Sequence, residues 1–133
     1  MAPYLIGKAQ ILDMHTYVVE RYGGRFGIVS SDTLDAVLAL PTQVVFGELR
    51  YRTPVAQIAA LVYGLVRRQP FVSHNETTAL LTLLYWCDNH GYHLDATHSA
   101  LVTVIMELYQ QRSEEPLQQW LHDHLIPNAD TTD

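Results

Sequence analysis

The sequence is poor in cysteine and lysine and contains no long apolar run. Cys87 is the one cysteine among 133 residues, so an internal disulfide is excluded and a reducing compartment is favoured. Polar residues interrupt every longer apolar run, and no span of about 20 apolar residues is present to cross a bilayer. The first ten residues lack the basic end and apolar stretch of a secretory signal. We therefore expect a cytoplasmic protein that does not bind membranes.

Positive charge is also scarce. Lys8 is the one lysine, and the formal net charge is −6. Because proteins bind nucleic acids by neutralising phosphates with Lys and Arg, this balance argues against a nucleic-acid partner. Arginines occur in two pairs, Arg50/Arg52 and Arg67/Arg68. Each pair is a candidate anion contact, although solvated helix ends are the favoured interpretation of both.

What the sequence does contain is a complete set of helix signals. Its 48% hydrophobic and 17% charged residues are typical of one globular domain of 133 residues. Apolar spacing together with capping residues predicts about six helices. They cover Leu5–Tyr22, Ser30 or Ser31 to Leu40, Pro54–Arg68, Asn75 to Gly91, Asp95–Gln111 and Ser113–Leu125.

The start signals of these helices are Thr53 before Pro54, and Asn75, Asp95 and Ser113 as N-caps. The helix that begins at Asn75 is apolar nearly all round, which is typical of a helix surrounded by others. Only the segment Phe46–Arg52 favours an extended flap or hairpin.

The predicted fold is therefore all-α, a bundle of about six helices around a buried central helix, with a short flap loop. We expect one domain over residues 1–126 and a polar C-terminal tail over 127–133.

A loop in front of the predicted central helix is the candidate chemical site. The first N–H groups of a helix have no partner within it, so a helix start suits an anion. The loop Gln69–His74 leads into such a start at Asn75. Pro70 stiffens this loop, and we expect Phe71 to anchor it in the core.

The stretch Gln69–Ala79 (QPFVSHNETTA) resembles the central motif of the Fic/Doc family, especially its Doc-like (death-on-curing) branch. That motif is His-Pro-Phe-x-Asp/Glu-Gly/Ala-Asn-Lys-Arg-Thr-Ala. Three further stretches resemble the end of the family's first helix, its flap and the end of its central helix. They are Arg21–Gly24, Phe46–Glu48 and Asn89–Tyr92, within a layout that agrees from about Leu5 to Leu125.

The departures from the motif fall on its chemistry. The resemblance implies a general-base histidine where Gln69 stands, and an amide does not titrate. It implies an acidic magnesium ligand at Ser73 and a phosphate-binding arginine at Thr77. Glu76 replaces lysine and repels phosphate, and His74 adds bulk at the usual glycine position. We expect His74 to fill the vacated anion pocket or to pair with Glu76.

The motif positions that shape the loop are retained. These positions are Pro70, Phe71, Asn75, Thr78 and Ala79. The sequence therefore predicts a family member with an intact scaffold and a degenerate site.

The leading hypothesis is a catalytically inactive Fic/Doc-fold protein that binds or regulates a protein or peptide. The resemblance implies a relation to the toxins of toxin–antitoxin pairs, in which an antitoxin segment lies in a groove near the site. We expect contacts along the flap and no cofactor. The candidate contact residues are Phe46, Glu48, Arg50, Tyr51 and Arg52, and Tyr51 is the aromatic favoured for a partner contact.

The alternative hypothesis is an active Doc-like toxin that transfers a nucleotidyl or phosphoryl group from ATP to a protein hydroxyl. In it, His74 is a displaced base, Glu76 holds magnesium, and Arg67 or Arg68 binds phosphate. Four simultaneous replacements in the motif disfavour this interpretation.

Other candidate chemistry has simpler explanations. The sequence contains seven histidines, but no acidic or cysteine cluster accompanies them, and we expect no metal site. His15 in the first helix is interpreted as structural, and Cys87 and Trp120 as packing residues.

Overall fold

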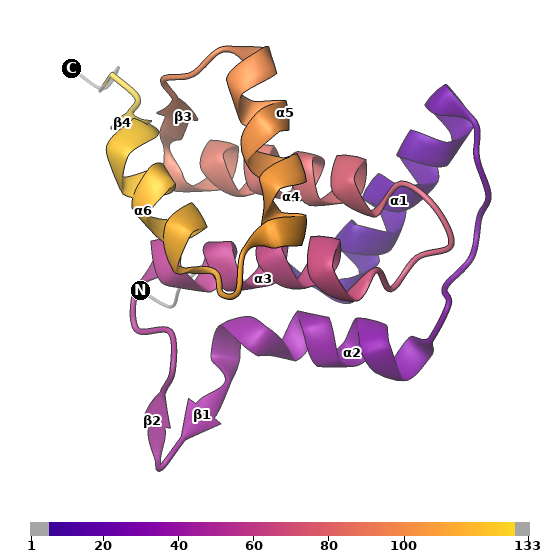
Figure 1. The fold of residues 1–133 in the computed structure, drawn as a ribbon, viewed down its shortest axis with the longest axis horizontal. Helices are drawn as coiled ribbons and strands as arrows, with labels where there is room; N and C mark the ends of the chain where they lie inside the picture. The colour runs from indigo at the N-terminus through magenta and orange to yellow at the C-terminus, as the bar shows by residue number, and fades with distance from the viewer. Residues whose placement is uncertain (1–5, 130–133) are drawn as a thin grey trace.

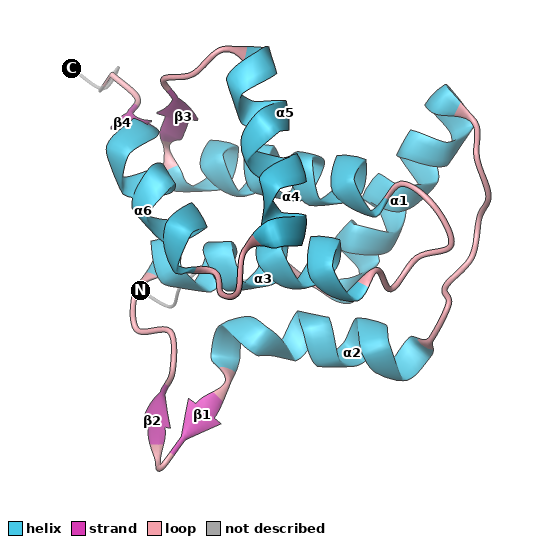
Figure 2. Ribbon diagram, viewed as in Figure 1, coloured by secondary structure: helices cyan, strands magenta, loops and turns pink. Residues whose placement is uncertain are grey.

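A computed structural model describes residues 6–129 and confirms an all-α fold. Within these residues six α-helices are joined by loops, two short 3₁₀ helices and two small antiparallel hairpins (Figures 1 and 2). The α-helices are α1 (Lys8–Tyr22), α2 (Ser31–Ala39), α3 (Pro54–Arg68), α4 (Asn75–His90), α5 (His98–Glu107) and α6 (Glu115–His124). The 3₁₀ helices are η1 (Leu40–Thr42) and η2 (Leu108–Gln110).

The ends of the expected chain fall partly outside this range. Leu5, the expected first residue of the first helix, and residues 130–133 of the expected tail lie outside the described residues. None of the helices within residues 6–129 is both long and apolar enough to cross a membrane.

Helix starts follow the sequence signals in part. Thr53 caps α3 through a hydrogen bond that its Oγ1 accepts from Ala56 N–H at 3.1 Å. At α5 the cap is Thr97, whose Oγ1 accepts from Ala100 N–H at 3.0 Å, and not Asp95. The prediction was wrong there because Asp95 continues the pairing of β3, with its N–H donating to His124 O at 2.8 Å, and the helix starts after it.

The core is centred on α3 more than on α4. Ten of the fifteen residues of α3 are buried, against seven of the sixteen of α4. α4 contacts α1, α3 and α5, as expected for a central helix, while α3 contacts α2, α4 and α6 and both 3₁₀ helices. The small residues of α3, including Ala59 and Ala60, explain how so many elements approach it closely.

Gly64 sets the closest of these approaches. A Cβ at Gly64 would lie 2.6 Å from Leu40 Cδ1 and 3.2 Å from Val37 Cγ1. The absence of that atom lets α2 and η1 pack directly on the α3 backbone.

The two hairpins differ in how well the sequence predicts them. β1 (Val44–Val45) pairs with β2 (Glu48–Leu49), which gives the hairpin form of the expected flap. β3 (Tyr92–Leu94) pairs with β4 (Leu125–Pro127), and this pairing was missed because both strands are short and distant in sequence. The Asn128 N–H also donates to Gly91 O at 2.8 Å. The predicted boundary at residue 126 thus falls inside β4.

Leu83 and Leu84 on α4 provide a matched test of the core. Leu83 is fully buried, whereas Leu84 is 38% exposed. We expect Leu83→Ala to lower the free energy of unfolding by about 2–5 kcal/mol, because it leaves a cavity. Leu84→Ala should cost about 1 kcal/mol or less. Urea unfolding of both variants measures the difference, and equal losses would contradict this assignment of the core.

Candidate functional site: the loop between α3 and α4

The loop between α3 and α4 bends sharply at both ends. Gln69 ends α3 at φ 46° and His74 precedes α4 at φ 58°, so both have left-handed backbone conformations. Such conformations are uncommon for residues other than glycine and persist where the surroundings hold them. The loop is therefore a fixed structure whose shape depends on contacts elsewhere.

Asn75 holds the loop closed. Its Oδ1 accepts from Phe71 N–H at 2.9 Å, and its Nδ2 donates to Phe71 O at 3.0 Å. Both side chains are buried, with Phe71 2% and Asn75 5% exposed. Asn75 is the first residue of α4 and not its N-cap, which corrects the sequence interpretation. The Asn75 amide reaches back four residues because it satisfies both backbone polar groups of Phe71, which are buried.

His15 supports the loop from α1. Its ring stacks on Phe71 with 4.0 Å between centroids, and its Nε2 donates to Ser73 O at 2.9 Å. Burial lowers the pKa of His15, opposed by the hydrogen bond to Ser73 and reinforced by the charge of His74. A neutral ring stacked on Phe71 acts as a structural residue, in agreement with the sequence interpretation.

A segment after α1 lies against the outer side of the loop. Val29 N–H donates to Pro70 O at 2.8 Å, and Val72 N–H donates to Gly27 O at 3.1 Å. Ile28 and Phe71 form an antiparallel bridge between these two hydrogen bonds. The segment from Gly23 to Val29 therefore covers the loop much as a neighbouring strand would.

The polar side chains of the loop are bonded to this segment. Ser73 Oγ donates to Arg25 O at 2.8 Å and accepts from Arg25 N–H at 3.0 Å. His74 Nε2 lies 2.7 Å from Gly23 O, so this ring nitrogen donates to the carbonyl. A Cβ at Gly24 would lie 2.8 Å from the His74 ring, so glycine is needed for this approach. His74 thus packs on the Gly23–Gly24 turn and not on Glu76.

Glu76 has a partner of its own. The Tyr109 hydroxyl donates a hydrogen bond to Glu76 Oε1. Burial raises the pKa of Tyr109, and the hydrogen bond and charge of Glu76 raise it further. Sequence reasoning missed Tyr109, because it lies 33 residues away in η2 and no local pattern points to it.

The remaining two motif positions carry no charge. Gln69 is exposed and Thr77 is half-buried. Of the six candidate residues, the structure therefore brings Ser73, His74 and Asn75 into one hydrogen-bonded loop, whereas Glu76 bonds with η2.

The histidines do not gather around one point. His93 Nδ1 lies 2.9 Å from Asn128 Oδ1, and His124 Nδ1 donates to Trp120 O at 2.7 Å. Across residues 6–129, no group of three or more His, Cys, Asp or Glu side chains is placed to hold a metal ion. Burial raises the pKa of Cys87 to about 11, so this thiol behaves as a core residue.

The flap lies at the opposite end of α3 from the loop. The β1–β2 hairpin precedes the first residue of α3, and Gln69 follows its last (Figure 1). A helix of fifteen residues is about 22 Å long. The flap and the loop are therefore two separate surfaces and not one groove.

The flap residues have different environments. Phe46 at the turn is fully exposed at φ 52°, and Glu48 forms an ion pair with Arg52. Arg50 stacks over Tyr51, with its Cζ 5.2 Å from the ring centroid. Tyr51 itself is only 6% exposed and packs with Ala56 and Ala60 in a small cluster. Tyr51 is thus largely buried as a packing residue, and its contact with a partner stays a prediction.

A sequence model of the Fic/DOC family matches residues 5–87. The chain belongs to the Fic/DOC family. The matched range includes α1, the flap, α3 and the loop, and it ends within α4. No curated protein matches the chain. In this Fic/DOC-family protein, the loop described above lies inside the matched region, and α5 and α6 lie beyond it.

Replacement of Asn75 tests how the loop is held. Asn75→Ala leaves the buried N–H and C=O of Phe71 unsatisfied, and we expect a loss of about 2 kcal/mol or more in the free energy of unfolding. Asn89→Ala is the matched control on α4, because Asn89 Nδ2 also donates to a backbone oxygen four residues away but is exposed. The control should change stability by about 0.5 kcal/mol. Chemical denaturation compares the two, and a loss in Asn75→Ala no larger than in Asn89→Ala would refute the role given to Asn75.

Proposed function

We propose that this protein is a catalytically inactive Doc-like member of the Fic/DOC family that binds a protein or peptide partner in the cytoplasm. The observation that carries the proposal is the occupation of the loop by the chain itself. Ser73 and His74 are bonded to the Gly23–Arg25 backbone, and Glu76 is bonded to Tyr109.

Nucleotide with magnesium does not fit the residues present. Ser73 Oγ already donates to and accepts from Arg25, so it is not oriented as a cation ligand. Glu76 sets negative charge in the first turn of α4, where a phosphate would approach the helix N–H groups. Gln69 offers no proton acceptor that titrates near neutrality. These residues therefore support neither a group-transfer step nor a cofactor.

The alternative transferase would need the same side chains in other places. His74 would have to leave Gly23 O to act as a base, and Glu76 would have to leave Tyr109 to hold magnesium. Arg67, one of the two candidate phosphate ligands beside Arg68, donates to Tyr109 O. No contact in residues 6–129 favours that arrangement over the closed loop.

The flap is the surface that supports partner binding. Apolar side chains of both strands and the turn are exposed, with Phe46 fully exposed and Val44 60% exposed. A two-stranded hairpin buries little and also leaves backbone groups at its edges available for a further strand. A partner segment in extended form, such as that of an antitoxin, can add to the hairpin and cover these side chains. The acidic net charge of the chain argues against a nucleic-acid partner.

Thermal unfolding with nucleotide tests the loss of activity. We expect ATP with magnesium to raise the midpoint temperature of unfolding no more than tripolyphosphate with magnesium does at the same ionic strength. The reason is that no site recognises the nucleoside. Scanning fluorimetry measures both midpoints. A shift that is specific to ATP and abolished by His74→Ala would contradict the proposal.

Substitution at the flap tests partner binding. The protein is co-expressed with the products of small reading frames beside its gene, and complexes are purified. Phe46→Asn keeps a residue that tolerates positive φ but removes the exposed ring, so capture should fall about tenfold or more. Met106→Gln on α5 is the control, because Met106 is also exposed, at 47%. Equal capture by Phe46→Asn and the unmodified protein would place the partner elsewhere.

A further inference from the structure

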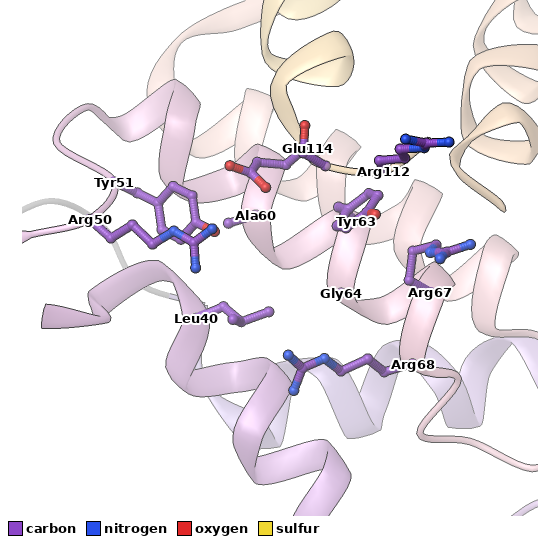
Figure 3. A pocket seen from close by; sticks show the side chains of 11 residues that line it. Leu40, Arg50, Tyr51, Ala60, Tyr63, Gly64, Arg67, Arg68, Arg112 and Glu114 are labelled. Carbon is purple, nitrogen blue, oxygen red and sulfur yellow. The ribbon is translucent and has the colours of Figure 1, made fainter. Parts of the chain in front are cut away.

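Four arginines line one pocket on the flap side of α3. Arg67 and Arg68 lie at the end of α3. Arg50 follows strand β2, and Arg112 precedes α6. Figure 3 shows Arg50 and Arg68 extending toward each other from opposite sides, with Arg67 and Arg112 further along. The cavity has a volume of about 160 Å³. One member of the Arg50/Arg52 pair and both members of the Arg67/Arg68 pair thus line the same pocket.

The charge of this pocket opposes that of the whole chain. The protein has a net charge of −6, yet four of its arginines line the pocket, and Glu114 is the one acidic lining residue. Burial raises the pKa of Tyr51, and the charge of Glu114 raises it further, while the charges of Arg50 and Arg68 lower it. These three charges therefore act on one buried ring, which indicates that they lie close together.

The arginines are incompletely satisfied within the protein. Arg67 donates to Tyr109 O and lies over the Tyr63 ring, with 6.0 Å from its Cζ to the centroid. Arg50 has a long hydrogen bond of 3.4 Å to Gln43 Oε1. Among residues 6–129, the ion pairs are Lys8–Asp35 and Arg52–Glu48. None of the four pocket arginines therefore forms an ion pair with a carboxylate in this part of the chain.

The pocket continues into a groove in both directions. On one side a cavity of about 360 Å³ shares Arg50, Tyr51 and Glu114 with it and extends along the start of α6. On the other side a cavity of about 420 Å³ shares Arg68 with it and extends past η1 to Gln43, beside β1. Three adjoining cavities suit an extended chain, whereas the central one is below the usual size for a whole small ligand.

We propose that this arginine groove binds an acidic segment of the protein partner, with carboxylates seated between Arg50 and Arg68. The inference rests on the proposed function and names the chemistry of the partner. Guanidinium groups bind carboxylates through paired hydrogen bonds, and Arg50 and Arg68 are exposed, so a partner can reach both. The groove reaches the base of the flap at Gln43, so one segment can cover the exposed flap and place its acidic residues in the groove.

A labelled octaglutamate peptide tests the groove by fluorescence anisotropy at low ionic strength. The unmodified protein should bind it and should not bind octaglutamine. The double variant Arg50→Gln/Arg68→Gln should weaken binding about tenfold or more. The control is Arg21→Gln/Arg25→Gln, which removes the same charge from the far side of the fold and should change affinity less than about twofold. The thermal midpoint of each variant confirms that it is folded.

Three outcomes would overturn the inference. One is the absence of octaglutamate binding, and another is an equal loss in both double variants, which would show a general effect of charge. The third is displacement by inorganic phosphate or by a phosphoserine peptide at a tenfold lower concentration than octaglutamate, which would assign the groove to phosphoryl groups.

The co-purified partner separates this inference from the proposed function. A partner that depends on Phe46 but is captured equally by Arg50→Gln/Arg68→Gln would refute the acidic segment and keep the binding module. A partner captured independently of Phe46 and of the arginines would refute both.

Discussion

The pair of hydrogen bonds between the Asn75 amide and the backbone N–H and C=O of Phe71 is the constraint on which the described site depends. It closes the turn that joins α3 to α4, and Phe71 is thereby fixed against His15 on α1. The outer edge of the same turn then presents Pro70 and Val72 to the segment after α1. One buried amide thus links α3 and α4 to α1 and to the segment that follows α1.

The positions of the helices along the chain could be predicted from the sequence, because apolar spacing and capping residues are local signals. The cap at Thr53 and the anchor at Phe71 are examples in which residue type alone determines the role. The β3–β4 pairing and the bond between Tyr109 and Glu76 could not be predicted in this way. Each joins residues more than thirty positions apart, and neither leaves a periodic pattern in the sequence.

The candidate site shows the same division between local and distant information. The loop positions Ser73 and His74 could be named from the motif resemblance, but their partners, Arg25 and Gly23, depend on how α1 ends and turns back. The burial of Tyr51 could not be predicted, because its neighbours in sequence are charged while its neighbours in space are the alanines of α3. The arginine groove was divided among three stretches of sequence, and only the packing of α3 brings them together.

The cover over the loop has an evolutionary consequence. Restoring charged ligands at the motif positions would leave the Gly23–Val29 backbone hydrogen-bonded along the same turn, at Pro70 and Val72. Phosphate binding at this loop would therefore need coordinated changes in two segments, whose effects are coupled because the segments are in contact. The two segments are expected to vary together among related sequences, because a change in either one alters the hydrogen bonds of the other.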